Sequence, residues 1–140
     1  HSFYNPIYGG WAGGAEGVLA DYIRCTPDGF VSLVGRDTLI YGALCHGAHG
    51  AIAATANVAP ALVVAIYERY RAGDLEGAAQ AQRDLAPLRQ AFGLGTFPAV
   101  VKEALDIMGL EAGPTRPPVG PLSPSQRQEL RGVLMGMGLV

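Results

Sequence analysis

The chain has 140 residues, of which 49% are hydrophobic and 16% charged, and its formal net charge is -2. This length suits one domain with a real core, and the composition is that of a folded protein. The slightly acidic balance, without any Lys/Arg cluster, argues against a nucleic-acid surface. No apolar run is long enough to span a bilayer, and we expect no signal peptide. Because only two cysteines occur, a reducing cytoplasm is the predicted location. The two cysteines, Cys25 and Cys45, imply no disulfide framework.

The first segment of the chain predicts little regular structure. Residues 1–17 have no clear periodicity, because two Gly-Gly pairs and a proline interrupt them. A short amphipathic helix is predicted over 18–25 from its apolar spacing. The Thr-Pro-Asp-Gly sequence at 26–29 is typical of a turn and ends that helix.

A strand–helix–strand unit follows the turn. The β-branched and apolar residues at 30–34 predict a strand that is buried on both faces. Asp37 is placed to cap a helix over 38–48, and a second buried strand is expected over 50–54. The distance between the two strand starts suits a right-handed crossover between parallel strands.

After Pro60 the pattern is helical to the end of the chain. Gly73 is expected to close the first of these helices, and Asp74 to cap the second. Residues 111–122 are rich in proline and predict an extended strap instead of a helix. Ser123, followed by Pro and later by Gln, is a strong start signal for the last helix. The apolar stripes expected to face the core include Leu62, Ile66, Tyr70, Ala81, Leu85, Leu88, Phe92, Val101, Leu105, Met108, Leu130, Val133, Leu134 and Met137.

The predicted fold class is therefore α/β: parallel strands with a crossover helix, then a cluster of antiparallel helices. Two strands that are hydrophobic on both faces cannot close a sheet. The sheet is expected to gain further strands, either from sequence beyond this chain or from a partner chain.

Four segments of the chain carry a resemblance to a known family. These segments resemble the dihydrodipicolinate synthase / N-acetylneuraminate lyase family, and they are LVGRD at 33–37, GAHGAIAATANVAP at 47–60, AGD at 72–74 and PAVVK at 98–102. The resemblance covers about residues 20–135. It implies a (β/α)8 TIM barrel followed by a C-terminal antiparallel helical bundle, of which residues 1–73 form part of the barrel and residues 74–140 the helical domain.

The resemblance also implies an activity. Members of the family are class I aldolases or lyases, often homotetramers, that bind pyruvate or another 2-oxo acid as a Schiff base on a lysine. An amine attacks the ketone, water leaves, and the iminium withdraws electrons while a carbon–carbon bond forms or breaks. We therefore expect a fragment of a cytoplasmic lyase, a homo-oligomer (dimer or tetramer), with a small 2-oxo acid as substrate and no cofactor.

The substrate-binding residues are those that the resemblance places at the carboxyl ends of the strands. It implies that Gly35 and Ile52 lie beside the pyruvate and that Arg36 and Asp37 belong to a variable specificity loop. Two alternatives, in which these polar residues have only structural roles, remain open. Arg36 and Asp37 can instead form a surface ion pair and a helix cap, and Asn57 can hold its loop with its amide instead of binding a ligand.

The chain departs from the family pattern at its catalytic residues. By family spacing the Schiff-base lysine falls near Gly10, where no lysine occurs, and Lys102, the only lysine, matches a position on a helix outside the barrel. Tyr4 is a weak candidate for the catalytic tyrosine. The alternative function is a non-catalytic binding or assembly module that retains the scaffold.

The cysteine and histidines near residue 45 resemble a metal-binding pattern only in part. Cys45, His46 and His49 lie close together in the sequence, but no further ligand of suitable type completes a set with them. We expect no metal site, and interpret the two histidines as residues at the end of a helix, where the helix dipole favours them.

Overall fold

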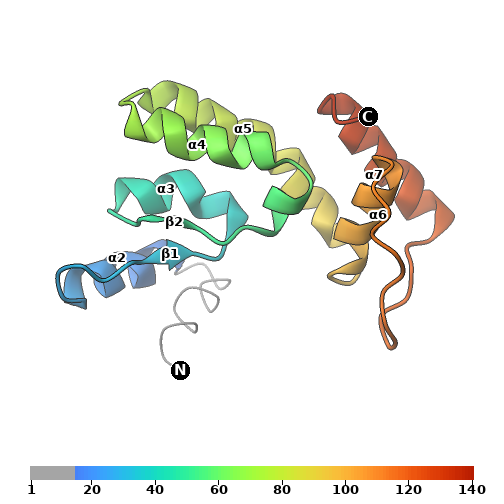
Figure 1. Cartoon of the computed structure of the whole chain (residues 1–140), viewed down its shortest axis with the longest axis horizontal. Helices are drawn as coiled ribbons and strands as arrows, with labels where there is room; N and C mark the ends of the chain where they lie inside the picture. The colour runs from blue at the N-terminus through green and yellow to red at the C-terminus, as the bar shows by residue number, and fades with distance from the viewer. Residues whose placement is uncertain (1–14) are drawn as a thin grey trace.

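The computed structural model describes residues 15–140. Parallel strands β1 and β2 lie beside the stacked helices α3, α4 and α5, and helices α6 and α7 lie beyond the carboxyl ends of the strands (Figure 1). The elements in chain order are α2 (Ala15–Cys25), β1 (Leu33–Val34), η2 (Asp37–Leu39), α3 (Ile40–Cys45), β2 (Gly50–Ala51), η3 (Ala54–Asn57), α4 (Pro60–Arg71), α5 (Leu75–Ala91), η4 (Phe92–Leu94), α6 (Ala99–Ile107) and α7 (Pro124–Gly136).

The two strands form the parallel pair that the sequence predicts. Leu33 lies opposite Gly50 and Val34 opposite Ala51 in the register of the sheet. Val34 is buried and Gly50 half-buried, and α3 makes the crossover between the strands. Because the strands are parallel, both carboxyl ends lie at one edge, on the side of α6 and α7 (Figure 1).

Both strands are shorter than predicted. The ladder extends by one hydrogen bond on each side, from the His49 N–H to the Ser32 carbonyl (2.8 Å) and from the Ile52 N–H to the Val34 carbonyl (2.9 Å). Each strand has only one neighbouring strand in the described part of the chain. The backbone then turns into η2 and η3, which leaves no partner to continue the pairing.

The crossover helix α3 ends earlier than the predicted range 38–48. It begins with a turn of 3-10 helix, and Gly47 ends it at a φ of +94°, where glycine is favoured. The Ala48 N–H bonds the Ala43 carbonyl and the Gly47 N–H bonds the Leu44 carbonyl, each at 2.9 Å, which is a Schellman ending. His49 therefore lies outside the helix, and its interpretation as a helix-terminal residue is wrong.

The helix boundaries after residue 60 follow their sequence signals closely. Gly73, at a φ of +83°, follows α4, and the Asp74 carboxylate accepts a hydrogen bond from the Gly77 N–H (2.9 Å) at the start of α5. Ser123 and Gln126 form the predicted capping box of α7. The strap, residues 111–122, contains no helix or strand. These predictions are confirmed.

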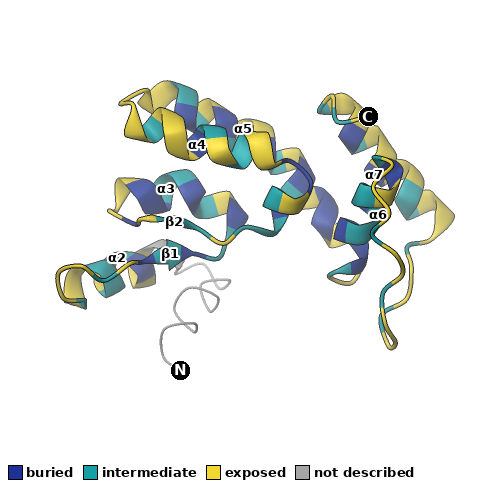
Figure 2. Ribbon diagram, viewed as in Figure 1, coloured by how far each residue is buried: buried dark blue, intermediate teal, exposed yellow. Residues whose placement is uncertain are grey.

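Helix α5 links the strand region to the C-terminal helices. It contacts α3, α4 and η2 along its length, and it contacts α7 as well. Buried residues lie where these elements face one another (Figure 2). One core cluster joins all of them, and its members include Leu19, Val34, Ile40, Leu44, Ile66, Leu85, Leu88, Val100, Leu130 and Leu134. The predicted domain boundary between residues 73 and 74 stays a prediction.

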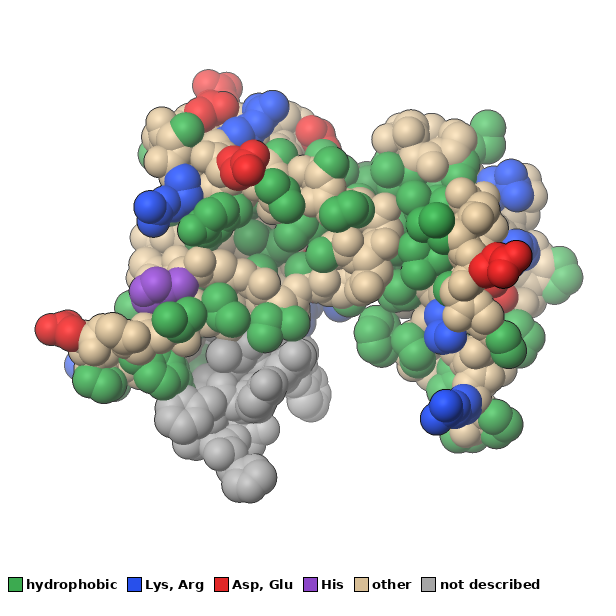
Figure 3. All heavy atoms as spheres, viewed as in Figure 1, with side chains coloured by type: hydrophobic (Ala, Val, Ile, Leu, Met, Phe, Trp, Pro, Cys, Tyr) green, Lys and Arg blue, Asp and Glu red, His purple; other side chains and the backbone are tan. Residues whose placement is uncertain are grey.

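Exposed hydrophobic side chains remain on the strand region. Val31 is 59% and Ile52 51% exposed, beside a sheet of only two strands. On the face drawn in Figure 3, hydrophobic side chains predominate between the charged groups of the α4–α5 end and those around α6 and the strap. Within residues 15–140, no helix combines the length and the apolar character that crossing a bilayer requires.

Candidate functional site

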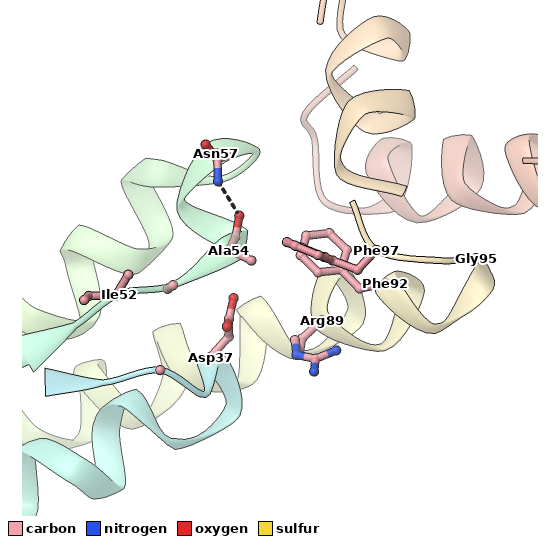
Figure 4. A pocket seen from close by; sticks show the side chains of 10 residues that line it. Asp37, Ile52, Ala54, Asn57, Arg89, Phe92, Gly95 and Phe97 are labelled. Carbon is pink, nitrogen blue, oxygen red and sulfur yellow. Dashed lines mark hydrogen bonds between the residues drawn. The ribbon is translucent and has the colours of Figure 1, made fainter. Parts of the chain in front are cut away.

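A cleft of about 510 Å³ opens at the carboxyl ends of the two strands. One wall comes from the loops after β1 and β2, and the other comes from the end of α5 and the segment that follows it (Figure 4). The lining residues are Gly35, Asp37, Ile52, Ala53, Ala54, Asn57, Arg89, Phe92, Gly95 and Phe97. In parallel barrels this edge of the sheet carries the chemistry.

Gly35 and Ile52 enter the cleft from equivalent places. Gly35 directly follows β1 and Ile52 directly follows β2, so the parallel register brings both to the same edge. Gly35 is half-buried, whereas Ile52 is 51% exposed. The structure thus brings these two predicted residues together, and their role beside a substrate stays a prediction.

Asp37 braces the two loops against each other. Its side chain is only 4% exposed, and Oδ2 accepts a hydrogen bond of 2.7 Å from the Thr55 N–H in η3. Asp37 lies inside η2 and makes no capping hydrogen bond there. The alternative of a surface ion pair and a helix cap is therefore wrong, because the carboxylate turns inward to a backbone donor on the other loop.

Arg36 takes no part in the contact between Asp37 and Thr55. It is half-buried, its Nε donates to Thr38 Oγ1 at 3.3 Å, and it does not line the cleft. Within the described residues Arg36 forms no ion pair with Asp37. Its predicted substrate contact gains no support from this position and stays a prediction.

Gln82 fastens helix α5 to the loop after β1. Its Nε2 donates to the Asp37 carbonyl and its Oε1 accepts from the Tyr41 N–H, each at 3.0 Å. One side chain thus forms hydrogen bonds with two backbone groups, one in the 3-10 helix and one in the first turn of α3. The bonds hold α5 at a fixed position along the cleft.

The α5 side of the cleft was not predicted from the sequence. Arg89 and Phe92 come from the end of α5 and η4, and Phe97 from the segment before α6 (Figure 4). A signal for Arg89 exists, because it lies four residues after Leu85 and so shares the inward face of α5. Phe97 carries no such signal, since no periodic pattern contains it.

Asn57 and Lys102 hold backbone in place. Asn57 Nδ2 donates to the Ala54 carbonyl at 3.0 Å, which is the loop-holding contact expected from the sequence (Figure 4). Lys102 lies in α6, and its Nζ donates to the strap carbonyls of Ala112 (2.8 Å), Gly113 (3.3 Å) and Pro114 (3.2 Å). The only lysine of the sequence is therefore engaged with the strap, and it does not line the cleft.

The remaining predictions concern the N-terminal residues and the histidines. Tyr4 and Gly10 lie outside the described residues. The His49 Nδ1 accepts a hydrogen bond from the Ser32 N–H (3.2 Å). Among residues 15–140 no group of three or more His, Cys, Asp or Glu side chains is arranged to hold a metal ion.

The fold and the cleft define a class of protein. Parallel strands with a crossover helix, and a cleft at their carboxyl edge, are features of helix-rich α/β proteins, in barrels and in open sheets alike. The model of the Dihydrodipicolinate synthetase family matches residues 14–136, and the chain belongs to this family.

Individual relatives agree with this assignment. A 4-hydroxy-tetrahydrodipicolinate synthase of Archaeoglobus fulgidus is 40% identical over 122 residues, which are 87% of this chain and 42% of that protein. That of Methanopyrus kandleri is 38% identical over 129 residues, 92% of this chain and 43% of that protein. The chain thus spans less than half the length of these relatives.

Solved structures of the family are also similar to this chain over part of their length. The dihydrodipicolinate synthase of Thermotoga maritima has a TM-score of 0.84 at 32% identity, covering 89% of this chain and 43% of that one. The prophage protein YagE from E. coli K12, solved in complex with pyruvate, has a TM-score of 0.81 at 29% identity and covers 89% of this chain and 44% of that one. The fold of the chain is that of part of these TIM-barrel proteins.

Proposed function

We propose that this chain supplies the C-terminal part of a pyruvate- or 2-oxo-acid-dependent Schiff-base aldolase or lyase. In this proposal residues 1–73 belong to the (β/α)8 barrel and residues 74–140 form a helical domain after it. The observation that carries the proposal is the meeting of Gly35 and Ile52 in one cleft at the carboxyl edge of parallel strands. Family membership and the pyruvate complex of YagE support it.

The described residues suit one wall of such a site. A glycine at the end of β1 lets a small 2-oxo acid approach the backbone closely. The Ile52 side chain offers an apolar surface against the iminium carbon. The Asp37–Thr55 bond keeps the two loops at a fixed separation, and fixed geometry is what positions a substrate for attack.

The nucleophile of this proposal lies on another part of the protein. A Schiff base needs a free amine beside the ketone, and Lys102 has its amine on three strap carbonyls. The same observation favours the second candidate, a non-catalytic binding or assembly module that keeps the scaffold. That module would bind pyruvate reversibly or not at all.

We further propose that the protein is a cytoplasmic homo-oligomer, a dimer or tetramer. The support is the hydrophobic surface that the described residues leave open, including Val64 (49% exposed) and Tyr67 (39% exposed) on the outer face of α4. Exposed apolar surface of this kind is typical of interaction sites. Sedimentation of the full-length protein measures the assembly state directly.

Borohydride trapping distinguishes an aldolase from the non-catalytic module. The full-length protein is incubated with pyruvate and sodium borohydride, and its mass is measured after removal of small molecules. The aldolase proposal predicts one reduced, covalent pyruvate adduct on a lysine. A protein that gains mass neither with pyruvate nor with 2-oxoglutarate in its place is the non-catalytic module.

A further inference from the structure

Arg89 differs from the other shielded arginines of the described chain. Three arginines in residues 17–140 are half-buried: Arg36, Arg89 and Arg127. Arg36 donates to Thr38 Oγ1, and Arg127 pairs with the Glu103 carboxylate. Arg89 has no hydrogen-bond or ion-pair partner among the described residues. None of the Arg89 nitrogens is among the buried, unpartnered side-chain atoms of the described residues, so all its donors remain accessible to a ligand.

The position of Arg89 makes it accessible to a ligand in the cleft. Arg89 lines the cleft from α5, across from the loop that carries Asp37 (Figure 4). Phe92, which is 7% exposed, and Phe97, which is 61% exposed, line the same wall of the cleft.

The buried carboxylate of Asp37 does not satisfy Arg89. The two groups form no ion pair within 4 Å among the described contacts, and Asp37 Oδ2 is already bonded to the Thr55 N–H. The guanidinium thus keeps its full set of donors, whose planar arrangement matches a carboxylate or a phosphate.

The size of the cleft leaves room for more than a three-carbon acid. Its volume of about 510 Å³ falls in the range of about 300–1,000 Å³ that is typical of pockets for much larger ligands. Gly35 and Ile52 occupy one wall, and Arg89 stands on the other. A substrate that spans the cleft therefore presents its far end to Arg89.

We propose that Arg89 is a specificity-determining residue that binds a second anionic group, a carboxylate or a phosphate, at the far end of the substrate. The proposal rests on the proposed function, because Gly35 and Ile52 define which end is the near one. It assigns a substrate with two anionic groups instead of pyruvate alone.

The test compares 2-oxo acids that differ only in their tails. Borohydride labelling of the full-length protein is measured against the concentration of pyruvate, of 2-oxoglutarate, and of 5-methyl-2-oxohexanoate, in which an isopropyl group replaces the distal carboxylate. Arg89→Leu is expected to raise the half-saturating 2-oxoglutarate concentration about tenfold relative to that of 5-methyl-2-oxohexanoate, a ratio that corresponds to one charge-assisted hydrogen bond. Arg89→Lys is expected to recover part of the loss.

A matched control lies on the same helix. Arg83 is exposed on α5 and bonds only Gln80, so Arg83→Leu removes the same charge without touching the cleft. This variant is expected to leave the ratio of the two half-saturating concentrations unchanged. An Arg89→Leu variant that shifts both acids equally, or neither, overturns the proposal, because the arginine would then serve the fold or balance Asp37 at a distance.

Anion titrations separate this inference from the proposed function. Calorimetric binding of inorganic phosphate and of glutarate to the full-length protein requires no Schiff base. Loss of glutarate binding in Arg89→Leu assigns a carboxylate tail, and loss of phosphate binding assigns a phosphate tail. If wild type binds neither anion, the proposal for Arg89 fails even where Schiff-base labelling succeeds; if neither pyruvate nor 2-oxoglutarate labels the protein, the proposed function fails by itself.

Discussion

The carboxylate of Asp37 accepts a hydrogen bond from the backbone N–H of Thr55 at 2.7 Å, across 18 residues of sequence. Asp37 follows the first strand and Thr55 the second, and both side chains are buried. The bond ties together the two loops that form one wall of the cleft. This hydrogen bond therefore stabilises the fold and also fixes the position of the two loops.

Replacing Asp37 by alanine is expected to lower the free energy of unfolding by about 1–3 kcal/mol, because the buried Thr55 N–H loses its acceptor. Asp37→Asn keeps an acceptor oxygen and is expected to lose less. Urea unfolding of the purified protein measures both. Asp84→Ala removes an exposed carboxylate on α5 and is the control; equal losses in Asp37→Ala and Asp84→Ala would contradict the brace.

Thr55 offers a second test of the same region. Its side chain is fully buried, and its Oγ1 has no hydrogen-bond partner among the described residues. Thr55→Val replaces this hydroxyl by a methyl group and is expected to be neutral or to stabilise by up to about 1 kcal/mol. Thr55→Ala keeps neither group and should destabilise through the space it leaves. A Thr55→Val variant as unstable as Thr55→Ala would show that the hydroxyl is bonded.

Lys102 is expected to stabilise the strap and not to act as the Schiff-base nucleophile. Lys102→Met removes the donor of three backbone carbonyls, so cleavage within residues 111–122 by limited proteolysis should become faster. Pyruvate-dependent borohydride labelling of the full-length protein should persist in this variant. Labelling that disappears while the protein stays folded, as judged by circular dichroism, would make Lys102 the nucleophile and would refute the assignment.

The phenol of Tyr41 should titrate above its ordinary value. A hydrogen bond with the Cys45 side chain, followed by desolvation, raises the pKa of Tyr41 above 10.0. Because the folded state holds this proton more tightly, the stability it contributes is present below pH 10 and is lost as the pH rises through the folded pKa. Cys45→Ala should lower the pKa towards 10.0, measured by tyrosinate absorbance, whereas Cys25→Ala should not. Identical titrations in both variants would contradict the pairing.

Helix boundaries were predictable where a local signal sets them. Ser123 with Gln126, Asp74 and Gly73 each act within one turn of the backbone, and the structure confirms all of them. The end of α3 at Gly47 had the same kind of signal, an αL glycine after an apolar run. The predicted helix passed Gly47 by one residue, because Ala48 is an alanine, the residue with the highest helix propensity.

The walls of the cleft depended on contacts that no local pattern encodes. Asp37 has the sequence position of a helix cap, yet its carboxylate bonds a loop that the crossover brings close only in the folded chain. Gln82 reaches Asp37 and Tyr41 from a helix more than 40 residues away. The resemblance identified Gly35 and Ile52 because they belong to short motifs, whereas Arg89 lies outside those motifs and emerged only from its place in the structure.

Borohydride labelling of a Gly35 variant tests whether Gly35 and Ile52 form one wall of a pyruvate site. The half-saturating pyruvate concentration is measured for the full-length wild type, for Gly35→Val, and for Gly132→Val, whose glycine lies exposed on α7 with open space around it. The account predicts labelling of the wild type and an increase of about tenfold or more for Gly35→Val alone, equivalent to about 1.4 kcal/mol of lost binding. Wild-type protein that is never labelled, or a Gly35→Val variant that saturates at the wild-type concentration, would contradict it.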